Sequence, residues 1–276
     1  MPQGKPRRFW LCADDYGIAP GVNAAIRDLI GRGRLNATSV MVVAPSFTPA
    51  EIGALKNAGK AAIGLHLTLT APFKPLTRNF APLAQVTFHP LQTTLRLALL
   101  RRLDCAALAR EVDMQVMAFR EAFGRPPDFI DGHQHVHLFP QVRDAVLDAA
   151  RRLAPGAWVR QAVSAAPVRA RLGDPKGLLI DALSRAVRRR ALKRGIATNP
   201  AFAGTYTYRP DADFARLFPG FLAGLPEGGL VMCHPGHVDA ELERLDPLTT
   251  LREREYAYLS SAAFPAALEA YGLTLN

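Results

Sequence analysis

The sequence predicts an α/β fold built on a parallel sheet, and three observations support this prediction. Short apolar runs alternate along the chain with segments of helical pattern, as in parallel α/β proteins. About seven such units are present, which is enough for the sheet to close as a barrel. Ionisable side chains follow several of the apolar runs, where α/β barrels build their sites. We expect residues 1–276 to form a single domain.

The expected strands are short runs rich in apolar and β-branched residues. They cover residues 9–13, 38–43, 61–67, 128–133, 158–160, 229–233 and 272–275. Proline at the first helical position and glycine after the last one support some of the helices between them. The expected helices cover residues 20–32, 48–58, 106–123, 140–153, 178–194, 211–223 and 251–262.

Two stretches do not fit this alternation. Residues 71–92 are rich in proline and threonine, and a loop of this length usually carries function or covers a site. Residues 165–205 contain a basic helix over 178–194 with no strand of its own, so we expect a basic helical insertion.

Composition bounds the class of protein. The chain is 49% hydrophobic and 21% charged, which is typical of a globular protein. The apolar runs are shorter than the roughly eighteen residues that a membrane span needs, and the basic N-terminus lacks the apolar core of a signal peptide. Three scattered cysteines fit a reducing compartment, so we expect a cytoplasmic protein.

The net charge of +10 leaves nucleic acid, an anionic membrane or acidic substrates open as partners. Much of this charge lies in the helix expected at 178–194, which also has an apolar side formed by Leu179, Ile180, Leu183, Val187 and Leu192. Such a helix could make peripheral membrane contact and present a lipid-linked sugar. The alternative is a helix that packs on the barrel and exposes its basic face.

A histidine-rich stretch lies at the centre of the functional prediction. In an extended segment, Asp131, His133, His135 and His137 would share one side of the chain. Imidazole is the commonest metal ligand in proteins, and carboxylates often orient such imidazoles. The stretch therefore indicates a metal site or an acid/base site.

Further ionisable residues are expected at the carboxyl ends of other strands. They are Asp14, Asp15, His66, Arg160 and His234. One carboxylate and two imidazoles form a metal-ligand set that leaves positions open for water and substrate. A second carboxylate could act as general base and a separate histidine could protonate the leaving amine. Because Asp14 and Asp15 are adjacent, we expect their carboxylates to point in different directions.

These residues resemble the motifs of the YdjC-like carbohydrate deacetylase family. The matching stretches are Ala13-Asp14-Asp15-Tyr16-Gly17 with Asn23, Gly64-Leu65-His66-Leu67-Thr68, Asp131-Gly132-His133-Gln134-His135-Val136-His137 with Phe139-Pro140, and Met232-Cys233-His234-Pro235-Gly236. Their order and spacing make the set specific. The chain departs from the family at Gly132, Gln134 and Tyr16, and the 178–194 region matches nothing in it.

The resemblance implies a distorted, TIM-like (β/α) barrel that removes the N-acetyl group from an acetylated amino sugar, as a metal-dependent hydrolase acting on linear amides. It implies Asp15, His66 and His133 as metal ligands, Asp14 as the base and His234 as the acid. Tyr16, Asp131, His135, His137 and Arg160 are expected to bind or orient substrate. Zinc or magnesium is the expected ion, and two imidazoles favour zinc or another transition ion.

The expected substrate is an acetylated saccharide or a glycolipid, and a homodimer stays open. The alternatives are another metal-dependent amide or ester hydrolase, or a non-catalytic basic protein that binds membrane or nucleic acid. Nucleic acid is not expected, because the basic cluster lacks interleaved aromatic residues and a recognition motif. No serine-hydrolase, phosphate-loop or dinucleotide motif is present in the sequence.

Overall fold

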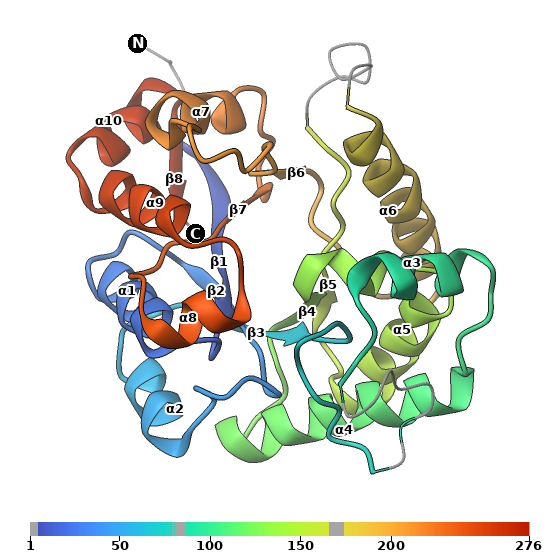
Figure 1. The fold of residues 1–276 in the computed structure, drawn as a ribbon. Coiled ribbons are helices and arrows are strands. Elements are labelled where there is room, and N and C mark those ends of the chain that lie inside the picture. Colours follow the sequence, from blue (N-terminus) through green and yellow to red (C-terminus); the bar gives the residue numbers. More distant parts are fainter. Residues whose placement is uncertain (1–4, 79, 81–86, 166–173, 276) are drawn as a thin grey trace.

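A curled, all-parallel sheet organises the molecule (Figure 1). The structure, a computed structural model, describes residues 5–78, 80, 87–165 and 174–275. The strands follow the order β5-β4-β3-β2-β1-β7-β6, and β8 pairs with β1 outside this path. The prediction of an α/β, TIM-like barrel of about seven parallel strands in one domain is confirmed.

The strands are short and mostly buried, because helices cover the sheet. Their bounds are β1 Arg7–Tyr16, β2 Ala37–Val40, β3 Ala62–Leu67, β4 Phe129–Gly132, β5 Trp158–Val159, β6 Phe202–Ala203, β7 Leu230–Cys233 and β8 Leu273–Leu275. β1 is the longest and pairs on both sides, with β2 and with β7. A strand buried in this way reads as a continuous apolar run, as the 9–13 segment does.

The two ends of the strand order meet at an isolated parallel bridge between Ser164, just after β5, and Phe202 of β6. The amide of Phe202 donates to the carbonyl of Val163 at 3.0 Å, and the amide of Ala165 donates to the carbonyl of Phe202 at 3.0 Å. Two backbone hydrogen bonds therefore link the edges of the curled sheet.

Helices surround the strands, with α3 to α6 at one side of the view and α1, α2 and α7 to α10 at the other (Figure 1). Their bounds are α1 Pro20–Gly31, α2 Pro49–Lys56, α3 Leu91–Leu99, α4 Cys105–Phe123, α5 Val142–Leu153, α6 Pro175–Lys193, α7 Phe214–Leu222, α8 Ala240–Leu245, α9 Thr250–Ser260 and α10 Ala263–Ala270. Among the helices described, none combines the length and apolar character needed to cross a membrane.

Local sequence signals fix several helix ends. Pro20 opens α1 and Thr48 caps α2 by accepting from the amide of Glu51. Asp104 caps α4 by accepting from two amides of its first turn. Gly124 ends α4 with a φ of 70°, which glycine adopts without strain.

The basic helix α6 packs on the barrel, which was the alternative to peripheral membrane contact. Leu183 and Val187 are buried, and Arg190 pairs with Asp144 of α5 at 2.9 Å. Of the predicted apolar side, Leu179 and Leu192 are exposed. A strand that was not expected, β6, follows α6, so the expectation of no strand here was wrong. Whether α6 is an insertion stays a prediction, and residues 166–173 of that stretch lie outside the described chain.

The predicted strand over 128–133 ends one residue early, and the extended alternation expected beyond it is wrong. A 3₁₀ segment, η1 (His133–Leu138), follows β4 directly. Gln134 and His135 have φ values of 54° and 60°, so the chain turns instead of alternating. Helix α3 was also not expected, and residues 79 and 81–86 of the predicted 71–92 loop lie outside the described residues.

Candidate metal centre

The carboxyl ends of β1, β3 and β4 bring the predicted ligands together. His66 of β3 stands in register with Asp131 of β4, and His133 follows directly in η1. The register of β1 against β2 shifts between Ala13 and Tyr16, where Asp15 takes a φ of 70°. A positive φ at a non-glycine residue is costly and clusters at functional sites.

Asp15, His66 and His133 form one compact group of buried donors. Asp15 Oδ1 lies 3.2 Å from His66 Nε2 and 2.9 Å from His133 Nδ1. One ligand atom from each residue lies within 4.8 Å of the other two. Ligands around a zinc ion at about 2.0–2.2 Å stand roughly 3–3.5 Å apart, so this donor set fits such an ion. Two imidazoles and one carboxylate suit a transition ion better than magnesium.

The other ring nitrogen of His66 is engaged away from the cluster. His66 Nδ1 lies 2.7 Å from Asp131 Oδ1 and 2.9 Å from Ser39 Oγ. Such a contact turns Nε2 toward Asp15, the arrangement that orients metal-ligating histidines. Burial opposes protonation of His66, but the carboxylates of Asp131 and Asp14 outweigh it and raise the pKa of His66 to about 10. Without a cation, a protonated His66 balances part of the carboxylate charge.

Asp14 and Asp131 share a buried guanidinium. Arg160 Nη1 and Nη2 donate to the two oxygens of Asp14 at 2.6 and 2.7 Å, and Nη2 pairs with Asp131 Oδ2 at 2.5 Å. Burial would raise the pKa of Asp14, but Arg160 outweighs it and lowers that pKa well below its usual range. Asp14 and Asp15 thus lie in the same site with different partners.

His234 follows β7 and lies beside this cluster. Its main-chain amide donates to Glu255 Oε2 at 2.5 Å, and its ring makes an edge contact with Tyr208. Glu255 also accepts from the hydroxyl of Tyr206 at 2.7 Å. Burial raises the pKa of Glu255 above its usual value.

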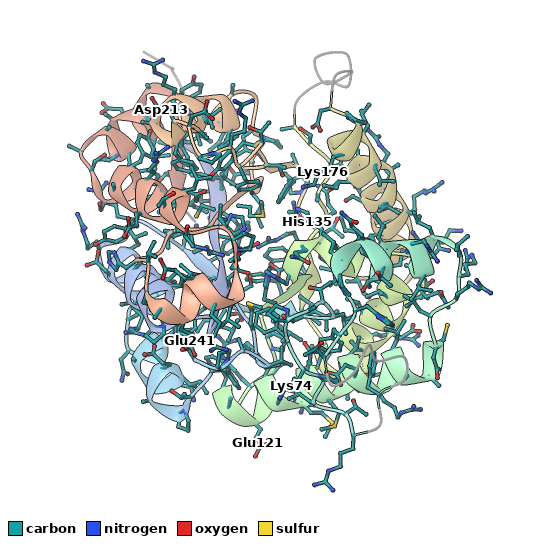
Figure 2. The ribbon with its side chains drawn as sticks, viewed as in Figure 1. Lys74, Glu121, His135, Lys176, Asp213 and Glu241 are labelled. Carbon is teal, nitrogen blue, oxygen red and sulfur yellow. The ribbon has the colours of Figure 1, made fainter. Side chains whose placement is uncertain are left out.

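Three residues that were expected to contact substrate make their described contacts outside the proposed ligand set. The Tyr16 hydroxyl donates to the main-chain carbonyl of Glu51 at 2.7 Å, so α2 engages it. His137 Nε2 donates to the carbonyl of Arg160 at 3.1 Å, which suits an orienting role. His135 lies near the middle of the molecule (Figure 2) and packs edge-on against Phe202. Burial, followed by the charge of Arg160, lowers the pKa of His135 to about 3. Contact of these residues with substrate stays a prediction.

Arg252 and Glu255 of α9 and Ser39 of β2 were missed by sequence reasoning. Arg252 is fully buried and its Nη2 donates to Asp15 Oδ2 at 2.7 Å. None of the three belongs to a recognised motif. Arg252 and Glu255 are three residues apart on a predicted helix, and such a spacing of charges is typical of a solvated face. Only the tertiary structure shows that they belong to the site.

A parallel barrel whose strand ends gather two imidazoles and several carboxylates defines an α/β-barrel protein with a candidate metal centre. The chain matches the family of YdjC-like proteins over residues 8–270, and it belongs to that family. The resemblance drawn from the motifs is thereby confirmed.

Curated relatives carry a more specific name. A chitooligosaccharide deacetylase from Yersinia pestis (strain Pestoides F) is 33% identical over 140 residues, which is 50% of this chain and 54% of the relative. One from Proteus mirabilis (strain HI4320) is 32% identical over 147 residues, 51% of this chain and 54% of the relative. The chain thus spans about half the length of the curated relatives it matches.

Solved structures support the fold. A protein from Enterococcus faecalis V583, named as a candidate cellobiose-phosphate cleavage protein, superposes with a TM-score of 0.76 at 21% identity, covering 99% of this chain and 97% of that one. A family 4 carbohydrate esterase from Streptomyces lividans, in complex with acetate, gives a TM-score of 0.50 at 12% identity, covering 99% and 93%. At these identities the likeness concerns the fold alone.

Proposed function

We propose that this protein is a metal-dependent hydrolase that removes the N-acetyl group from an acetylated amino sugar and releases acetate. The observation that carries the proposal is the buried group of Asp15, His66 and His133, whose donor atoms lie within 4.8 Å of one another. Membership of the YdjC-like family and the name of the curated relatives support the sugar substrate.

Asp15, His66 and His133 would hold the ion, and zinc fits these donors best. A divalent ion bound there would supply Lewis-acid polarisation of the acetyl carbonyl and lower the pKa of a water molecule. The chain's own part is to keep the three donors in place and to exclude bulk water, which the burial of all three accomplishes. Asp131 keeps His66 in the orientation that presents Nε2.

Asp14 would accept the proton of the attacking water. Its lowered pKa keeps it ionised at neutral pH, so the acceptor is always available. Arg160 binds both carboxylate oxygens and fixes their direction, so positioning contributes more than basicity. His234, held through its main-chain amide by Glu255, would protonate the leaving amine.

A water-soluble acetylated saccharide fits the structure better than a glycolipid. The apolar side of α6 is largely used in packing, with Leu183 and Val187 buried, and leaves Leu179 and Leu192 exposed. Two separate leucines give little area for lipid contact, whereas interfacial helices bury a continuous apolar face. The name of the curated relatives points to chitooligosaccharides as the first substrates to test.

Acetate release from N-acetylglucosamine oligomers tests the proposal. We expect activity with zinc, loss of activity after chelation, and recovery on adding the ion back. Asp14→Asn should lower kcat by about 10²–10⁴-fold, because it removes the proton acceptor, while zinc binding persists. Simple acetyl esters, assayed in parallel, separate an amide hydrolase from a general esterase. Acetate release from esters only, or release that withstands complete chelation, would contradict the proposal.

A further inference from the structure

Arg252 is a buried cation that contacts the candidate metal centre through the proposed ligand Asp15. Its Nη2 donates to Asp15 Oδ2 and to Asp246 Oδ2, both at 2.7 Å. Its Nε donates to the carbonyl of Leu248 at 2.9 Å. The side chain is fully buried, so these contacts hold the guanidinium in one place. An unpaired buried charge is strongly destabilising, and the carboxylates of Asp15 and Asp246 supply the pairing here.

The two oxygens of Asp15 face different groups. Oδ1 faces the ring nitrogens of His66 and His133, whereas Oδ2 faces Arg252. Asp15 therefore turns one oxygen toward the two proposed ligand histidines, whereas its other oxygen is engaged by Arg252. A carboxylate without this partner could offer both oxygens, as Asp and Glu often do to a cation.

The same residue also contacts the loop that carries His234. The amide of Gly236 donates to the carbonyl of Arg252 at 3.1 Å. A Cβ at Gly236 would lie 3.3 Å from Arg252 Cδ and 2.9 Å from Val22 Cγ2, so the absence of a side chain permits this close approach. One turn further along α9, Glu255 accepts from the amide of His234 at 2.5 Å. Helix α9 thus contacts both the proposed ligand Asp15, through Arg252, and the proposed acid His234, through Glu255.

We propose that Arg252 is a positioning residue that limits Asp15 to one oxygen toward the ion and, through its charge, keeps the ion a strong Lewis acid. This inference rests on the proposed function, because it requires an ion at Asp15, His66 and His133. A positive charge next to a ligand weakens the attraction of the site for a cation. It also withdraws electron density from that ligand, which favours polarisation of the substrate carbonyl. Arg252 therefore lowers ion affinity and raises turnover.

Opposite effects on binding and turnover distinguish this role from a merely structural one. A residue that only supports the fold would, when removed, weaken ion binding and catalysis together. Calorimetric titration of the metal-free protein with zinc, combined with kcat and KM for acetate release at saturating zinc, measures both quantities on the same preparations.

For Arg252→Gln we expect about tenfold tighter zinc binding and about 10–100-fold lower kcat, with KM within about twofold. Arg252→Lys keeps the charge and should bind zinc nearly as the wild type does. Asp246→Asn removes the carboxylate that shares Arg252, so the cation acts more strongly on Asp15 and zinc binding should weaken severalfold. Because Asp246 is partly exposed, this variant tests the idea even where Arg252→Gln fails to fold.

Arg152→Gln is the matched control, since it removes a partly exposed arginine–aspartate pair between α4 and α5, away from the metal centre. It should leave zinc affinity and kcat unchanged. Weaker zinc binding in Arg252→Gln, or wild-type values of both quantities, would overturn the inference. Asp15→Asn separates this failure from that of the proposed function: if the wild type binds no divalent ion, or Asp15→Asn binds it equally well, the metal site itself is wrong.

Discussion

At the scale of single residues, each of the two adjacent aspartates has its own buried arginine. Asp14 is paired with Arg160 and Asp15 with Arg252. Burial alone would raise the pKa of both carboxyl groups, yet the arginines and nearby histidines lower both pKa values below the usual range. The charges at this site are therefore stabilised by specific partners within the fold.

These shifts predict how the stability of the metal-free protein depends on pH. An aspartate in the unfolded chain has a pKa of about 3.9, and both folded values lie lower. The stabilisation is fully present above about pH 4 and is lost as the pH falls through the folded values, because the unfolded state binds the protons first. Urea unfolding at a series of pH values between 6 and 2 should show the free energy of unfolding falling below about pH 4.

Variants assign this loss to the site. Asp14→Asn removes one of the groups that titrate differently in the two states, so its free energy of unfolding should change less steeply below about pH 4. Asp211→Asn is the control, since Asp211 is exposed and pairs with the exposed Arg209 at the surface. A wild-type slope in Asp14→Asn, or a slope equally reduced in Asp211→Asn, would contradict this explanation.

Much of the candidate site could be predicted residue by residue. Asp14, Asp15 and His66 end apolar runs, so a parallel sheet necessarily brings them to one edge. The further alternation from His133 to His137 could not be predicted correctly. It depends on the left-handed backbone at Gln134 and His135, which neither residue type requires. Arg252 reaches the site from α9, more than 200 positions along the chain from Asp15, and no local pattern records that contact.

At the scale of elements, α4 holds the segment that follows β3 against the site. Glu111 accepts from the amides of Leu76 and Thr77 at 3.0 and 2.8 Å. Gln115, one turn along, donates to the carbonyl of Thr68 at 2.8 Å. Phe73, within the segment so held, makes an edge contact with the ring of His133. Phe73, in the described part of the predicted 71–92 loop, thus lies against one side of the metal centre.

Removing this anchor should loosen the segment. In Glu111→Ala the amides of Leu76 and Thr77 lose their acceptors, so their hydrogen exchange should speed up markedly, and kcat/KM should fall about tenfold as Phe73 loses its position. Exchange measured by mass spectrometry on peptides covering residues 70–78 is the direct readout. Glu121→Ala is the control on the same helix, since Glu121 lies at the periphery of the molecule (Figure 2). Unchanged exchange in Glu111→Ala would contradict the anchoring role.

Helices long enough to show a period could be located from the sequence. The helices at 20–32 and 106–123 match α1 and α4 closely. The missed strand β6 has two residues, too few for any alternation. Helix α3 starts at Leu91 behind a proline-rich stretch, whose composition indicated a continuing loop.

At the scale of the whole molecule, the parallel sheet explains why the site lies where it does. All the paired strands described run in the same direction, so their carboxyl ends share one face. The two edges of the sheet meet through Ser164 and Phe202. This contact brings β5, and Arg160 just after it, close to β6 and its neighbour β7. Residues scattered from 14 to 255 therefore converge on one centre.

The most direct test of this account is an anomalous-scattering map from a crystal soaked in zinc, recorded at the zinc absorption edge. The account predicts one peak at bonding distance, about 2.0–2.2 Å, from Asp15 Oδ1, His66 Nε2 and His133 Nδ1. A map with no peak among these three atoms, or with its principal peak bound elsewhere, would contradict the claim that they share one ion.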